Sequence, residues 1–232
     1  IIHTYGVVKQ AEELAGRMHL SAEDTDLARL IALLHDIGRF EQLKRYDSFE
    51  PGTMDHAAYG VKVLFDEGMI RRFLPDDKWD SIIYTAIAHH SDYELPEILD
   101  PQTLLHAKLI RDEDKLDNCR VKLVDSTSTF INVSEEELGT QNITQKVYET
   151  VFENKCILSA DRVTQMDYWV SYIVYFFDIN FKESFDIIAE NDYLNRIIDR
   201  IPYSNPVTKE QMENIRVYMQ NFINSHTNSQ SF

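Results

Sequence analysis

The sequence predicts an all-α fold, because it has few turn-forming residues and its apolar residues recur at helical spacing. Only 7 of the 232 residues are Gly and 6 are Pro. This is about half the usual usage, which leaves few turns for a many-stranded sheet or a Gly-rich phosphate loop. With 44% hydrophobic residues the chain can still form a core. We therefore expect a helical bundle.

The first helices are predicted from apolar stripes and their flanking signals. The first stripe contains Val7, Ala11 and Leu14. The second contains Leu27, Leu30, Ile31 and Leu34 and follows Ser21-x-x-Asp24, a sequence that resembles a capping box. A turn at Pro51-Gly52-Thr53 is expected to lead into a helix through Val61 and Leu64 that stops at Gly68.

Helical spacing continues through the rest of the chain. Further helices are expected at about 76–90, 101–120, 142–155, 163–178, 181–190 and 207–224. Clustered Ser and Thr over Val121–Thr140 predict a loop. No repeat is found, and no linker precedes the polar tail after Asn224. We expect a core at 1–125 and a helical extension at 126–232 that packs on it, together forming one compact unit.

Charge and cysteine usage exclude several classes of function. Lys and Arg number 23 against 39 Asp and Glu, and the net charge of -16 repels phosphate backbones and anionic lipid. We therefore expect no nucleic-acid or membrane partner. Cys119 and Cys156 form no CxxC pair, so neither a disulfide framework nor a thiolate metal site is indicated, and a cytoplasmic location is expected. The longest apolar stretch, Tyr168–Phe177, is too short to span a bilayer.

Most of the 8 histidines fall on the apolar faces of the predicted helices. His3, His56 and His90 continue the apolar stripes of their helices. His35, followed by Asp36, ends a helix that is apolar nearly all round and therefore belongs in the centre of the domain. Asp114 is placed in the same way, on the apolar side of its own helix.

Inward carboxylates and imidazoles on separate helices predict a metal site. A buried ionised carboxylate is costly unless it is paired, hydrogen-bonded or bound to a metal. Imidazole nitrogen and carboxylate oxygen suit first-row divalent ions, and no thiolate favours structural zinc, so the site is expected to be catalytic. The alternative is a set of hydrogen-bonded core histidines, with Asp114 paired to Arg111 or Lys115.

The local motifs support the metal site. They read HTYGVV at His3, ALLHDIGR at the His35-Asp36 doublet and AKLIRDEDKLDN around Asp114. Their order resembles the HD superfamily of metal-dependent phosphohydrolases over about residues 1–120. DHAAYGV at His56 and AIAHHSD at His89-His90 look like the additional ligands of the binuclear branch of that superfamily.

The resemblance implies an HD-domain helical bundle with a C-terminal helical extension, holding one or two divalent ions. Mn2+ or Fe2+ is favoured, and Mg2+, Ni2+, Co2+ and Zn2+ are compatible with the ligands. The implied ligands of the first ion are His3, His35, Asp36 and Asp114, and those of the second are His56 and His90. Asp36 is the candidate bridge, and we expect catalysis to depend on Asp36, His56 and His90.

His90 is favoured over His89 as a ligand because it continues the stripe of Ile83 and Ile87, whereas His89 lies on a neighbouring face. The expected substrate contacts are Arg39, His89, Arg111, Lys115 and Asn118.

DKLDN, which contains Lys115 and Asn118, is similar to the DRLHN of guanosine tetraphosphate hydrolases. Those enzymes, however, carry two acidic residues where this chain has Arg39 and Phe40. This difference argues against guanosine tetraphosphate as the substrate.

The expected function is metal-dependent hydrolysis of a phosphate ester or anhydride in a nucleotide or another small phosphorylated metabolite. One alternative is a cyclic nucleotide or dinucleotide phosphodiesterase, although the Gly-Tyr-Pro tripeptide of cyclic-dinucleotide HD enzymes is absent. Another is a non-catalytic HD module that binds a regulatory ligand. The aromatic helix at Tyr168–Phe177 is interpreted as core or as a homodimer interface rather than a base-stacking platform.

Overall fold

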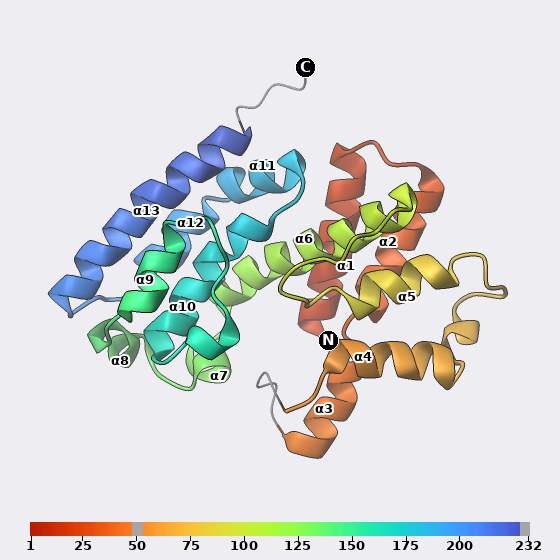
Figure 1. The fold of residues 1–232 in the computed structure, drawn as a ribbon, viewed down its shortest axis with the longest axis horizontal. Helices are drawn as coiled ribbons and strands as arrows, with labels where there is room; N and C mark the ends of the chain where they lie inside the picture. The colour runs from red at the N-terminus through yellow and green to blue at the C-terminus, as the bar shows by residue number, and fades with distance from the viewer. Residues whose placement is uncertain (48–52, 228–232) are drawn as a thin grey trace. The chain divides into compact units, whose positions relative to one another are not determined.

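A computed structural model describes residues 1–47 and 53–227, which form helices and no strands (Figure 1). The expected all-α fold is confirmed. The chain divides into two compact units, Ile1–Asp114 and Lys115–Phe232. The boundary falls inside the long helix α6 (Pro101–Val124), eleven residues before the division expected at residue 125. The placement of the extension on the core stays a prediction.

The helices of unit 1 form one connected bundle, in which the second helix packs against the fifth. Its helices are α1 (Ile2–Arg17), α2 (Ala22–Leu34), α3 (Gly38–Tyr46), α4 (His56–Val61), α5 (Asp80–Ala88) and the first part of α6. α1 packs along α2, and α4 packs against both α3 and α5. A π-helical segment, Lys62–Asp66, and a 3-10 turn, Met69–Arg72, follow α4.

Several predicted helix ends in unit 1 are confirmed. Ser21 caps α2, since its hydroxyl accepts a hydrogen bond from the Asp24 N–H at 3.0 Å. The helical segment that begins with α4 ends at Gly68, which has a left-handed backbone with φ of 76°. Of the turn expected before α4, Pro51 and Gly52 lie outside the described residues, and Thr53 lies in a turn.

Gly38 begins α3, a helix that the apolar pattern did not predict. This glycine lets the backbone at the start of α3 contact the backbone of α4. A Cβ on Gly38 would lie 2.0 Å from the His56 carbonyl oxygen and 2.9 Å from the Gly60 nitrogen. Backbone atoms cannot rotate away as the end of a side chain can. Residue 38 must therefore be glycine for the segment after Asp36 to lie against the start of α4.

The loop prediction for Val121–Thr140 is wrong, because unit 2 forms helices over most of this segment. α6 continues to Val124, and two short helices follow, α7 (Ser128–Ile131) and α8 (Glu135–Thr140). Ser134 caps α8 by accepting a hydrogen bond from the Glu137 N–H at 3.2 Å. This serine therefore starts a helix, because a hydroxyl that disfavours helix interiors favours the N-cap position.

The remaining helices of unit 2 surround an aromatic core. They are α9 (Gln145–Val151), α10 (Gln165–Val174), α11 (Lys182–Glu190), α12 (Tyr193–Asp199) and α13 (Pro206–Thr227), with 3-10 turns at Ser159–Asp161 and Tyr175–Asp178. Trp169 of α10 is fully buried. His226 is half-buried, and its ring stacks on Phe185 with centroids 4.5 Å apart. In the described part of the chain, no helix is long and apolar enough to cross a membrane.

The contact at Gly38 predicts a strong effect of one added methyl group. Gly38→Ala should lower the free energy of unfolding by about 1–3 kcal/mol, the usual cost of overpacking. Gly16→Ala is the control: a Cβ there meets nothing within 4 Å, and alanine should stabilise α1 by about 0.5–1 kcal/mol. Urea unfolding followed by circular dichroism measures both, and equal stability of the two variants would contradict the close approach.

Candidate metal centre

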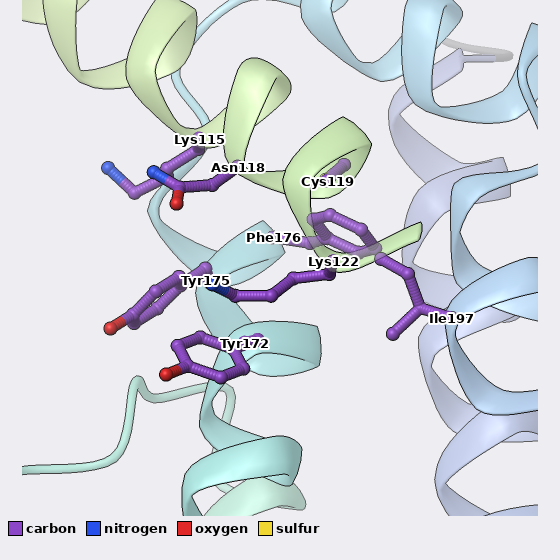
Figure 2. Close-up of a pocket in the computed structure, with 8 residues that line it drawn as sticks. All are labelled: Lys115, Asn118, Cys119, Lys122, Tyr172, Tyr175, Phe176 and Ile197. Carbon is purple, nitrogen blue, oxygen red and sulfur yellow. The ribbon is translucent and has the colours of Figure 1, made fainter. Parts of the chain in front are cut away.

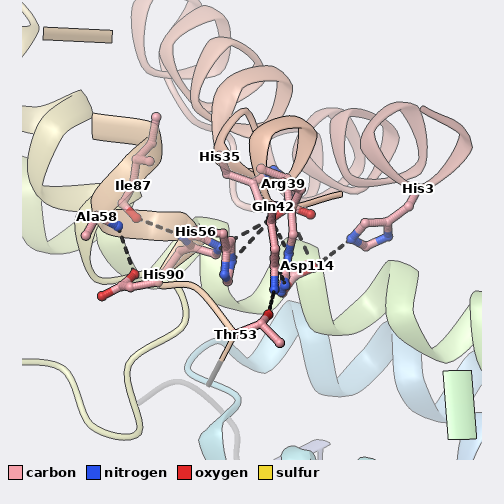
Figure 3. A network of polar contacts seen from close by, with 12 residues as sticks. His3, His35, Arg39, Gln42, Thr53, His56, Ala58, Ile87, His90 and Asp114 are labelled. Carbon is pink, nitrogen blue, oxygen red and sulfur yellow. Dashed lines mark hydrogen bonds and ion pairs between the residues drawn. The ribbon is translucent and has the colours of Figure 1, made fainter. Parts of the chain in front are cut away.

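Six histidine and aspartate side chains from five elements of unit 1 meet in one cluster (Figure 3). α1 supplies His3, and the end of α2 supplies His35 and then Asp36. α4 begins with His56, the turn after α5 holds His90, and α6 supplies Asp114. All six were expected as ligands, and the structure brings all six together.

The first group of ligand atoms surrounds Asp114. His3 Nε2 lies 2.9 Å from Asp114 Oδ1, and His35 Nε2 lies 3.9 Å from the same oxygen. One atom from each of these three side chains lies within 4.8 Å of the other two. The three residues could therefore share one ion.

The second group surrounds Asp36. His56 Nε2 and His90 Nε2 are 3.1 Å apart and lie 3.4 and 3.7 Å from Asp36 Oδ1. The other oxygen, Asp36 Oδ2, lies 3.6 Å from His35 Nε2. The two oxygens of Asp36 thus face different histidines, as a carboxylate shared by two ions requires.

Backbone contacts fix which nitrogen of two histidines faces the cluster. His35 Nδ1 lies 2.7 Å from the Ala32 carbonyl. His90 Nδ1 lies 2.7 Å from the Ile87 carbonyl (Figure 3). Because a carbonyl only accepts, each Nδ1–H donates, which leaves Nε2 of each ring facing the cluster as the candidate ligand atom. His35 Nε2 is buried and has no hydrogen-bond partner among the described residues. A lone pair aimed at carboxylate oxygens needs a cation between them, so the donor set fits a metal ion.

The ionisation states also suit metal binding. Burial opposes ionisation of Asp36, but His35, His90 and Arg39 outweigh it and hold the pKa of that carboxyl well below its usual range. Contacts with His3 and His35 likewise outweigh burial and lower the pKa of Asp114. Burial, helped by the charge of Arg39, lowers the pKa of His56 to about 3. At neutral pH the carboxylates are therefore charged and His56 is neutral, which are the forms that bind metals.

His89 lies outside the cluster. Its side chain is 34% exposed, and Nδ1 lies 2.6 Å from Asp92 Oδ2. The adjacent His90 is buried and faces Asp36. The apolar stripe therefore pointed to the histidine that the structure places among the other candidate ligands.

Arg39 lies beside the cluster in a chain of hydrogen bonds. Its Nε is 3.4 Å from Asp36 Oδ1, and its Nη1 donates to Gln42 Oε1 at 2.8 Å. Gln42 is fully buried, and its Nε2 donates to Thr53 Oγ1 at 2.8 Å. Sequence reasoning missed Gln42 because a polar residue inside a short helix gives no periodic signal, and it missed the contact of Thr53 because a turn residue gives none either. This chain of hydrogen bonds holds the Arg39 guanidinium next to the Asp36 carboxylate.

Three other expected substrate contacts lie in different surroundings. Arg111 is buried and donates to backbone carbonyls of the turn that holds His90. Lys115 and Asn118 line a small cavity within unit 2 (Figure 2), and Lys115 Nζ lies 2.6 Å from Asp178 Oδ2. The cavity volume of about 10 Å³ admits about one water molecule. Substrate contact by these three residues stays a prediction.

Two further buried groups lie on α6. His106 Nε2 is 3.1 Å from Asp24 Oδ1, which ties α6 to the first turn of α2. Glu113 is fully buried, and neither of its side-chain oxygens has a hydrogen-bond partner among the described residues. Burial, with smaller contributions from Asp112 and Asp114, raises the pKa of Glu113 well above its usual range, which favours the protonated form of this side chain. Nothing in the sequence indicates that Glu113, which is adjacent to the candidate ligand Asp114, is buried.

Comparison with known families gives one match. The family model described as HD domain matches residues 1–119, the segment that holds the whole cluster. No curated protein and no solved structure matches the chain significantly.

The Asp24–His106 pair predicts a pH dependence of stability. Burial lowers the pKa of His106 although Asp24 opposes the shift, so a proton binds more readily to the unfolded chain. The free energy of unfolding should therefore fall as the pH drops below about 6.5. His106→Gln does not titrate, and its stability should decline less between about pH 7.5 and about pH 5.5. Urea unfolding of chelator-treated protein measures this, and parallel declines would rule out a contribution from His106.

Proposed function

The chain belongs to the HD domain family, and we propose that it is a metal-dependent phosphohydrolase that acts on a nucleotide or another small phosphorylated metabolite. The observation that carries this proposal is the placement of Asp36. One of its oxygens faces His35 and the other faces His56 and His90. This arrangement supports a centre with two neighbouring divalent ions, of which Mn2+ or Fe2+ is favoured.

The cluster supplies ligands for both ions. His3, His35 and Asp114 would hold one ion, His56 and His90 would hold the other, and Asp36 would contact both. Divalent ions at such a site lower the pKa of bound water and neutralise charge on phosphoryl oxygens. All the ligand positions are filled, which favours an enzyme over a binding module without activity.

The protein side chains prepare the site for an anionic substrate. The two ionised carboxylates attract the divalent ions, and the neutral imidazoles bind through nitrogen without adding charge. Arg39 can donate to a phosphoryl oxygen, because its side chain is 30% exposed and Gln42 holds its head group. His89, which is partly exposed and adjacent to His90 in the sequence, is another expected substrate contact in unit 1.

The doublet gives the first test. Protein purified without chelator should carry about one to two divalent ions per chain, and Asp36→Ala should lose metal and reduce hydrolysis to background, because both ions lose a shared ligand. The matched control is His19→Asn: His19 is exposed with a φ of 53°, a backbone conformation that asparagine tolerates. Elemental analysis and a screen of phosphomonoesters, nucleotides and diesters provide the readouts. A wild-type chain that binds no divalent ion, or equal activity in both variants, would contradict the proposal.

The second test separates the two ions. His56→Ala and His90→Ala should each lower the metal content by about one ion and remove most of the activity, because both face Asp36 Oδ1. His89→Ala, outside the cluster, should keep the metal and lose at most about tenfold in rate, as expected for a change beyond the ligands. Metal stoichiometry and turnover are measured side by side. Full metal content in the first two variants would mean a mononuclear site.

A further inference from the structure

Arg111 is a buried cation with an unusual set of partners. It lies on α6 and is only 2% exposed. Its Nη1 lies 3.0 Å from the His89 carbonyl oxygen, 2.7 Å from that of Asp92 and 3.5 Å from that of His90. All three carbonyls belong to the turn that follows α5.

These carbonyls lie at and just beyond the end of α5. The helix ends at Ala88 with His89 as its C-cap, the His89 carbonyl also accepts from the Asp92 N–H at 3.4 Å, and the last carbonyls of a helix have no intrahelical donor. A guanidinium at this end satisfies them and places a positive charge at the negative end of the helix dipole. Arg111 therefore fixes the path of the backbone at the residue that carries a candidate ligand.

The same side chain links two parts of the cluster. Arg111 is three residues before Asp114 on one continuous helix, and the turn that it holds contains His90. The His90 ring is oriented by the Ile87 carbonyl, but the position of the turn relative to α6 depends on Arg111.

We propose that Arg111 is a positioning residue that sets His90 at bonding distance from the second ion while Asp114 binds the first. This inference rests on the proposed function for the identity of the site. Because the Arg111 side chain is buried and its guanidinium binds backbone oxygens, its role is to hold a ligand rather than to contact substrate. Lysine cannot replace it fully, since one ammonium does not reproduce the planar, forked donor set.

The first measurement is metal affinity, with Mn2+ alone titrated into metal-free protein. Arg111→Met should weaken the second ion by about 10–100-fold, the usual effect of losing a residue that orients a ligand, and should leave the first ion within about threefold. The matched control is Arg200→Met in unit 2, since Arg200 also donates to backbone carbonyls, those of Lys122 and Asp125. The control should leave both affinities unchanged.

A double substitution separates positioning from general destabilisation. If Arg111 acts through His90, then Arg111→Met should cost no further Mn2+ affinity in a His90→Gln background. Additive losses, or equal weakening of both ions, would overturn the proposal. If circular dichroism shows that Arg111→Met does not fold, Arg111→Lys is used in its place. Arg111→Lys should lower the affinity for the second ion by about three- to tenfold in the wild-type background and should cause no loss in the His90→Gln background.

A measurement on metal-free protein keeps this inference distinct from the proposed function. Long-range proton–nitrogen spectra report which ring nitrogen of each histidine carries the proton. Arg111→Met should disturb the Nδ1–H signature of His90 and leave that of His35 intact, because the Ala32 carbonyl that binds His35 does not involve Arg111. Failure of the wild type to bind Mn2+ would refute the metal site alone. An unchanged His90 spectrum would refute the role of Arg111.

Discussion

The candidate site depends on the desolvation of Asp36. This carboxylate lies within 3.7 Å of nitrogens from His35, His56 and His90. A buried negative charge is costly unless surrounding groups compensate it, and burial also lowers the pKa of His35 and of His56, which disfavours their imidazolium forms. Several features of unit 1 hold the compensating groups close to Asp36. The glycine at residue 38 lets the start of α4 approach, and the chain from Arg39 through Gln42 to Thr53 holds a permanent cation at the rim.

Besides one candidate ligand, α6 carries other buried titratable side chains. Asp114 faces the cluster, and burial raises the pKa of its neighbour Glu113, which favours the neutral form of that carboxyl. A second ionised carboxylate at this position would repel both Asp112 and Asp114. Two turns earlier, His106 ties the helix to Asp24 at the start of α2, whose far end carries His35. The helix that bears one ligand is thereby connected to the helix that presents another.

The sequence predicted the helical class and the inward histidines because both follow from periodicity. A stripe such as Val7, Ala11 and Leu14 indicates which face is buried, and a polar residue on that face must turn inward as well. Other features depend on contacts between distant segments. Nothing in the pattern around Arg111 indicates that its partners are carbonyls of the turn after α5. The segment before Thr140 was misread for a different reason: serine and threonine occur in loops and at helix starts, and only the resulting hydrogen bonds distinguish these roles.

His35 belongs to both groups of atoms close enough to share an ion. An imidazole nitrogen has a single lone pair directed at the cluster, so His35 can bind only one ion at a time. The two positions are therefore unequal: the ion that takes His35 leaves the other with fewer protein donors. Under the proposed function, the centre would load sequentially as metal becomes more abundant. A partly loaded form would therefore persist when the supply of metal is low.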